Sequence, residues 1–136
     1  MADLQIKVDM KKLRNIINNE PARADAWLRG VGMQILGDIQ LSFGTSPDGK
    51  THTRGTVKHV ASQPGYPPNI DTGALRGSMG LRKLGNMTYE IHDGVEYGVH
   101  LELGTEQMAA RPFVNPVFAE WQKKIMDDAK QKLDID

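Results

Sequence analysis

The sequence contains no cysteine and no long apolar run, and both absences narrow the class of protein. Without cysteine, the chain has no disulfide and no thiolate ligand for a metal ion. No apolar stretch approaches the roughly 20 residues that cross a bilayer, so we expect no association with a membrane. Residues 1–10 alternate in polarity and carry charges, unlike a signal peptide. We therefore expect the protein to fold in a cytoplasm.

A net charge is also lacking, because 17 basic residues balance 17 acidic residues. Dedicated nucleic-acid binders carry a basic excess that displaces counterions from phosphates, so neutrality disfavours this class of protein. Neutrality also weakens the repulsion between copies, which suits a protein that packs against itself. The 136 residues fit a single domain, 1–136, and a hydrophobic fraction of 39% predicts a small core.

Two segments have the four-residue apolar spacing of amphipathic helices. In residues 22–43 this stripe consists of Trp27, Val31, Ile35, Ile39 and Phe43. Pro112 suits a first helical position, and the stripe that follows it consists of Phe113, Val117, Trp121, Ile125, Ala129 and Leu133. Residues 11–19 predict a shorter helix. The glycines within 22–43 indicate that another backbone approaches this helix closely, or else that the helix is frayed or kinked; they are Gly30, Gly32 and Gly37.

Alternating polarity predicts strands at residues 4–8, 75–84, 87–92 and 95–103, of which the last alternates most cleanly. Gly85-Asn86 is a hairpin signal between the second and third strands, and Asp93-Gly94 marks another tight turn. The predicted fold class is α+β, with an antiparallel sheet of three to four strands packed against two amphipathic helices. Residues 44–70 are rich in Pro and Gly without periodicity, and they predict a long flexible loop.

Asp71-Thr72-Gly73 is similar to the loop that supplies the paired aspartates of retroviral-type aspartic proteases. In those enzymes the loop follows an apolar strand, whereas here it follows the extended segment 67–70. Asp71 or Thr72 also suits the cap of a turn that enters the next strand. Two interpretations of this segment therefore remain: a structural turn, or the active-site loop of a homodimeric aspartic protease that uses Asp71.

No other pattern indicates catalysis or ligand binding. None of His52, His59, His92 and His100 has the helical spacing of a metal site, and we expect His92 and His100 to face each other across the turn at Asp93. No phosphate-binding loop or Ser-His-Asp set is present. The sequence thus predicts no metal, no cofactor and no enzymatic activity.

The first part of the predicted loop is basic, and the residues in it that are positively charged at neutral pH are Lys50, Arg54 and Lys58. These residues suit contact with DNA or with an acidic neighbour, and they equally suit a solvated surface loop.

Three segments together resemble a known family. They are 63–79, which contains Pro67-Pro68 and Thr72-Gly73; 95–105, which ends in Glu102-Leu103-Gly104-Thr105; and 110–117, which contains Arg111-Pro112-Phe113. Their order and spacing are similar to those of the neck or tail-completion proteins of tailed bacteriophages, the gene-product-ten-like family of tail components. One departure is Gly98, where the family often has Ala.

The resemblance implies a virion subunit that is part of a ring of six or twelve copies in the head-tail neck or at the end of the tail tube, as a neck, tail-completion or tail-terminator protein. Its implied partners are its own copies, the connector and the tail-tube protein. DNA passes through the channel without sequence-specific binding, and assembly takes place in the cytoplasm of the bacterial host. A regulatory adaptor outside the virion remains an alternative.

We expect subunit contacts at the sheet edges, in the loop 44–70 and in the segments that carry the resemblance. The residues expected at these interfaces are Asp71, Thr72, Gly73, Leu75, Arg76, Tyr97, Glu102, Gly104, Thr105, Arg111, Pro112 and Phe113. A charge-assisted bond between Glu102 and Arg111, or from either to a neighbouring subunit, is expected to order the link between the last strand and the last helix.

Overall fold

The computed structural model describes residues 10–54, 56–70, 73–94 and 97–134, and these form an α+β fold. The elements in chain order are α1 (Met10–Asn19), α2 (Pro21–Ser42), β1 (Asp48–Arg54), β2 (Val57–Ser62), α3 (Ala74–Ser78), β3 (Gly80–Gly85), β4 (Thr88–His92), α4 (Tyr97–Leu103) and α5 (Asn115–Leu133). The predicted fold class and the helices predicted at 11–19 and 22–43 are confirmed. The strand predicted at 4–8 lies outside the described residues.

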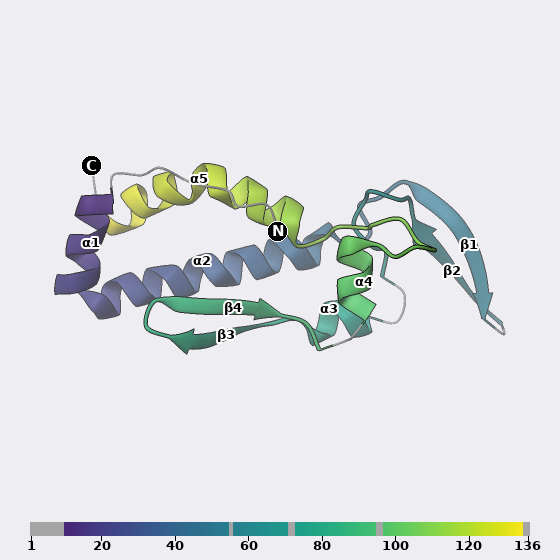
Figure 1. Ribbon diagram of the computed structural model, residues 1–136, viewed down its shortest axis with the longest axis horizontal. Helices are drawn as coiled ribbons and strands as arrows, with labels where there is room; N and C mark the ends of the chain where they lie inside the picture. Colours follow the sequence, from purple (N-terminus) through teal and green to yellow (C-terminus); the bar gives the residue numbers. More distant parts are fainter. Residues whose placement is uncertain (1–9, 55, 71–72, 95–96, 135–136) are drawn as a thin grey trace.

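The long helix α2 forms the axis of an elongated molecule (Figure 1). Helix α5 lies along one side of α2 in the opposite direction, and the β3–β4 hairpin lies along another side (Figure 1). Helix α1 covers one end, where Leu13 packs against Ala129 and Leu133 of α5. The β1–β2 hairpin lies at the other end, and α3 and α4 lie between it and the helices (Figure 1).

The strands form two separate antiparallel hairpins, where the sequence predicted one sheet of three to four strands. Strand β1 pairs with β2 with His52 opposite His59, and β3 pairs with β4 with Leu81 opposite Ile91. A hairpin turn joins β3 and β4 as predicted, but its two residues are Asn86 and Met87, one position later than the predicted Gly85-Asn86, with Met87 at a φ of 53°. In the described part of the chain no third strand joins either hairpin, so their outer edges are unpaired.

Helix α4 replaces the strand predicted at residues 95–103, so that prediction is wrong for Tyr97–Leu103. Val95 and Glu96 lie outside the described residues. Leu101 is half-buried against the core, whereas Val99 and Leu103 are exposed, so the alternating residues do not share one buried face. The helix ends where Gly104 adopts a φ of 77° and donates to His100 O at 2.8 Å, a common helix terminus.

The expected pairing of His92 with His100 is therefore wrong, because His100 lies on α4 and His92 pairs with Gly80 in the β3–β4 hairpin. The first residues of the strand predicted at 75–84 form α3 instead, and the strand begins at Gly80. Residues 44–70, predicted as an irregular loop, contain the β1–β2 hairpin. The last helix begins at Asn115 with Pro116 in its first turn, not at Pro112.

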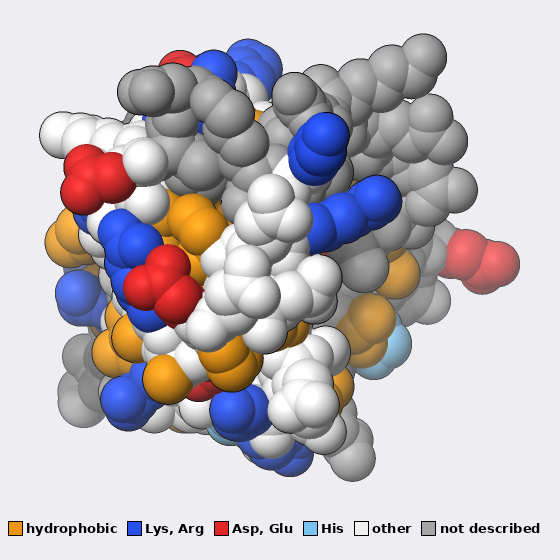
Figure 2. Space-filling view, turned by 90° about the vertical axis from the view of Figure 1, so that its left-hand side faces the viewer, with side chains coloured by type: hydrophobic (Ala, Val, Ile, Leu, Met, Phe, Trp, Pro, Cys, Tyr) orange, Lys and Arg blue, Asp and Glu red, His pale blue; other side chains and the backbone are white. Residues whose placement is uncertain are grey.

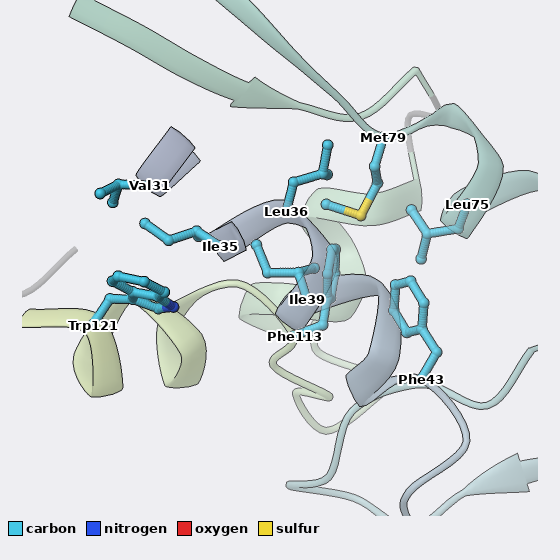
Figure 3. Packing of buried hydrophobic residues seen from close by; sticks show 9 residues of the cluster. All are labelled: Val31, Ile35, Leu36, Ile39, Phe43, Leu75, Met79, Phe113 and Trp121. Atoms are coloured by element: carbon cyan, nitrogen blue, oxygen red, sulfur yellow. The ribbon is translucent and has the colours of Figure 1, made fainter. Parts of the chain in front are cut away.

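The core gathers apolar side chains from α2, α3, α5 and the segments that follow α3 and precede α5 (Figure 3). Phe113 and Ile39 are almost fully buried at its centre. The ring centroids of Phe113 and Phe43 are 5.5 Å apart. Burial of such side chains is the main favourable contribution to folding, at roughly 1.5–3 kcal/mol each. The core therefore joins the helical body to the end that carries the β1–β2 hairpin.

One of the three glycines of α2 allows β3 to pack closely against this helix. A Cβ on Gly32 would lie 2.8 Å from Leu81 Cδ1, so this glycine lets β3 lie against the helix. The contact is with a side chain and not with a backbone, and a Cβ on Gly30 or Gly37 would meet nothing within 4 Å in the described part of the chain. The prediction of close backbone approach is therefore wrong for these three glycines.

None of the helices described here is long and apolar enough to cross a membrane. At the end that carries α1, hydrophobic, basic and acidic side chains are interspersed over the visible surface (Figure 2).

Candidate interaction groove

The segments that resemble the phage family meet at the junction between the helical body and the β1–β2 hairpin. Gly65 N donates to Ala110 O at 2.8 Å, which joins the first segment to the third. Arg111 N donates to Leu101 O at 2.6 Å, which joins the third segment to the second. Segments that are distant in the sequence, such as those of Gly65 and Ala110, therefore form one hydrogen-bonded unit.

Glu102 caps the last helix. Its Oε2 accepts the backbone N–H groups of Phe113 at 2.7 Å and Val114 at 3.0 Å, and its Oε1 accepts that of Asn115 at 2.9 Å. The first N–H groups of a helix lack partners within the helix, and the positive end of its dipole favours a carboxylate. No side chain of the helix itself caps it, so α4 supplies the cap from outside.

Arg111 makes a different bond from the one predicted. Its Nε donates to Ser62 O at the end of β2, at 3.3 Å, and the described residues contain no ion pair between Arg111 and Glu102. The expected pairing of these two charges within the chain is therefore wrong. Both residues still order the link, Glu102 through backbone N–H groups and Arg111 by joining the link to the hairpin.

A groove of about 620 Å³ opens at this junction, between the β1–β2 hairpin, α3, α4 and the link before α5. Its apolar lining includes Phe43, Ala61, Pro68, Leu75, Leu101 and Met108. Its polar lining consists of His52, His59, Ser62, Asn69, Arg76 and Arg111. None of the described lining residues is Asp or Glu, so the groove combines apolar surface with donor and cationic groups.

The predicted interface residues lie in several different environments. Gly73, Leu75, Arg76 and Arg111 line the groove. Leu75 and Phe113 are also core residues, buried to 8% and 1% exposure, so most of their surface contacts the chain itself. Pro112 and Tyr97 lie in the link and at the start of α4, and Asp71 and Thr72 lie outside the described residues.

Gly104 and Thr105 shape the link rather than line the groove. Gly104 has a positive φ, and a Cβ there would lie 2.9 Å from Ala110 N, so only glycine fits this close approach. Thr105 N donates to Met108 O at 2.8 Å and closes the loop between them.

The basic residues predicted in the loop lie on the hairpin. Lys50 and Arg54 belong to β1 and Lys58 to β2, with the Lys50 and Lys58 side chains exposed. The groove residues His52, His59 and Ser62 were not predicted from the sequence as site residues. Residues 51–60 are rich in threonine and valine on both sides of Gly55, a composition typical of two strands joined by a turn, and this was the available signal.

Ser62 has an unusual environment for a hydroxyl. The residue is 2% exposed, and its Oγ has no hydrogen-bond partner in the structure. A buried hydroxyl without a partner costs roughly 1–3 kcal/mol, so such groups call for an explanation.

A second polar cluster, on the other side of α2, attaches the β3–β4 hairpin. Tyr89 donates its hydroxyl to Asp25 Oδ2 at 2.8 Å, and Lys83 Nζ lies 3.1 Å from Asp25 Oδ1, an ion pair without hydrogen-bond geometry. The Tyr89 bond, followed by Lys83, lowers the pKa of Asp25 below its ordinary 3.8. Partial burial, followed by the bond to Asp25, raises the pKa of Tyr89 above 10.0. This cluster is structural.

The described residues contain no group of three side chains that could bind a metal ion. No protein-family model, curated protein or solved structure matches the chain. The described lining of the junction groove presents apolar, donor and cationic groups.

Proposed function

We propose that the chain is a structural subunit of a tailed-phage virion, forming part of a ring in the head-tail neck or at the end of the tail tube. The observation that supports this most directly is the junction itself. The segments 63–79, 95–105 and 110–117 carry the family resemblance, and their described parts are bonded to one another around one groove. Motifs that share a surface serve a shared purpose more readily than motifs scattered through a fold.

The hairpin at the end of the molecule supports a role in assembly. Its strands β1 and β2 have outer edges without strand partners among the described residues. An exposed strand edge is a template for pairing with another chain. A ring is built from head-to-tail contacts, in which one end of a subunit meets a different surface of the next. The groove and the hairpin would supply one of these two surfaces.

The charge supports a channel wall better than a DNA-binding surface. The chain is neutral overall, and a hairpin whose basic residues are Lys50, Arg54 and Lys58 carries few positive charges for a tight DNA contact. Weak, non-specific contact permits DNA to slide past during packaging and ejection.

Native mass spectrometry of the purified chain at neutral pH tests the proposal. A species of six or twelve copies is expected. A discrete dimer that cleaves peptides, and that loses this activity in Asp71→Asn, would instead establish the aspartic protease alternative.

A further inference from the structure

The groove at the junction has the volume and the lining of a binding site. Its volume of about 620 Å³ lies within the roughly 300–1,000 Å³ of pockets that bind small ligands or short segments. Apolar side chains form much of its wall, and Phe43 and Leu75 on this wall also belong to the core, so the wall is rigid (Figure 3).

Two cations in the groove have no acidic partner among the described residues. Arg111 uses Nε for Ser62 O and makes no ion pair with a described residue, so its terminal N–H groups can donate to a ligand. The side chain of Arg76 makes no hydrogen bond or ion pair in the described part of the chain, and only its carbonyl accepts a bond, from Gln40 Nε2. A guanidinium favours a planar acceptor such as a carboxylate, to which it can donate two bonds.

Ser62 is a second and independent sign of a missing partner. Its Oγ is buried without a hydrogen-bond partner, in a residue that lines the same groove as both arginines. Because Oγ has less than 1 Å² of accessible surface, a ligand acceptor would satisfy this hydroxyl and remove its cost only after the Ser62 side chain rotates toward the groove.

We propose that this groove binds a short peptide segment of a partner protein, in which a carboxylate side chain is flanked by apolar side chains. The carboxylate accepts from Arg111 and Arg76, and the apolar side chains lie against the wall formed by Leu75, Leu101 and Met108. Charge complementarity favours this occupant, because the described lining offers cations and donors without a single acid. The groove would bind such a segment whether or not the chain is part of a virion.

Two other occupants are possible outcomes of a test. One is the chain's own Asp71, which lies outside the described residues and close in sequence to the lining residue Gly73. The other is a second copy of the chain.

Titration of the ¹⁵N-labelled full chain with two capped peptides, followed by NMR, separates these occupants. The probes are acetyl-Leu-Glu-Ile-Leu-amide and its Gln counterpart, which differ only in the carboxylate. The Glu peptide is expected to shift the amide signals of Ser62, Asn69 and Arg111, and to bind at least tenfold more tightly than the Gln peptide. Arg76→Gln and Arg111→Gln should each reduce this difference, whereas Arg82→Gln, at an exposed residue of the other hairpin, should not.

Several results would overturn the proposal. These are the absence of shifts up to 10 mM peptide, equal affinity for the two peptides, and shifts outside the groove. Binding that appears only in Asp71→Asn would show that Asp71 occupies the site. Groove signals that change with protein concentration alone, together with a larger mass, would show that a second copy occupies it. Because Arg76 is exposed, Arg76→Gln keeps the test decisive if Arg111→Gln does not fold.

Discussion

The indole Nε1 of Trp121 donates a hydrogen bond of 2.8 Å to Asp38 Oδ2, which joins α5 to the last third of α2. A reciprocal bond of 2.9 Å runs from Trp27 on α2 to Asp128 on α5. Each helix therefore supplies one donor and one acceptor to the other. The two bonds together fix the antiparallel alignment of α2 and α5. This alignment in turn positions the link before α5 that lines the groove.

Replacing the acceptor of the first bond should destabilise the fold. Asp38→Ala leaves the N–H of the buried Trp121 without its partner and should lower the free energy of unfolding by about 1–2 kcal/mol. Gln34→Ala, at an exposed position one turn earlier in α2, is the matched control and should change it by less than about 0.5 kcal/mol. Urea denaturation followed by circular dichroism measures both, and equal losses would contradict the role of this bond.

Removing the cap of α5 should lower the free energy of unfolding by more than removing a nearby charge does. Glu102→Ala deprives three backbone N–H groups of their acceptor and should cost about 1–3 kcal/mol. Glu106→Ala removes an exposed carboxylate of the same link and should cost less than about 0.5 kcal/mol. If thermal melts show the two variants to be alike, Glu102 does not cap the helix in solution.

The Asp25 cluster predicts how stability depends on pH. Because the pKa of Asp25 is lowered in the folded state, its contribution is complete above the unfolded value near 3.8 and is lost as pH falls through the folded value. Asp25→Asn should therefore be less stable than the wild-type chain at pH 6, and the difference should shrink as pH falls below about 4. Melting temperatures from pH 6 to pH 2 check this, and a constant difference would contradict it.

Tyr89 gives the opposite dependence at high pH. Its pKa is raised above 10.0, so its contribution is complete below that value and is lost as pH rises through the folded pKa. Tyr89→Phe should remove this alkaline loss, measured as the change in melting temperature between pH 8 and pH 11. An unchanged alkaline loss in the variant would contradict the assignment.

The β1–β2 hairpin should be needed for assembly and not for folding. Gly49 and Ser62 lie next to each other at its base, since a Cβ on Gly49 would lie 2.6 Å from Ser62 O. Residues 50–60 can thus be replaced by Asn-Gly. The shortened chain should melt within a few degrees of the wild type, because the core cluster contains no residue of 50–60. It should also fail to form rings, and intact assembly would show that the hairpin makes no essential subunit contact.

The elements with strong periodicity were predictable, and those with ambiguous periodicity were not. Helix α2 was predicted within a residue at each end because its apolar stripe continues over the whole segment. The alternating polarity of residues 97–103 is compatible with a strand, but Tyr97 and Leu101 also have the four-residue spacing of one helical turn. Gly104, which ends this helix with a positive φ, is the residue in the sequence that indicates a helix over a strand.

The residues of the candidate site could in part be predicted from motifs in the sequence, whereas their bonding partners and arrangement could not. The sequence indicated that Glu102 and Arg111 order the link before the last helix, but not that their partners are backbone atoms of 113–115 and Ser62. Such bonds depend on how distant segments pack, and backbone acceptors and donors leave no trace in residue type. The unpartnered hydroxyl of Ser62 is likewise visible only once the fold buries it.

The central claim is that the chain is a virion subunit in a ring around the DNA channel. The most direct test is quantitative mass spectrometry of particles purified from the phage that carries its gene, with the portal protein as the internal standard. The proposed role predicts six or twelve copies of the chain in each particle. Absence of the chain from purified particles would contradict it.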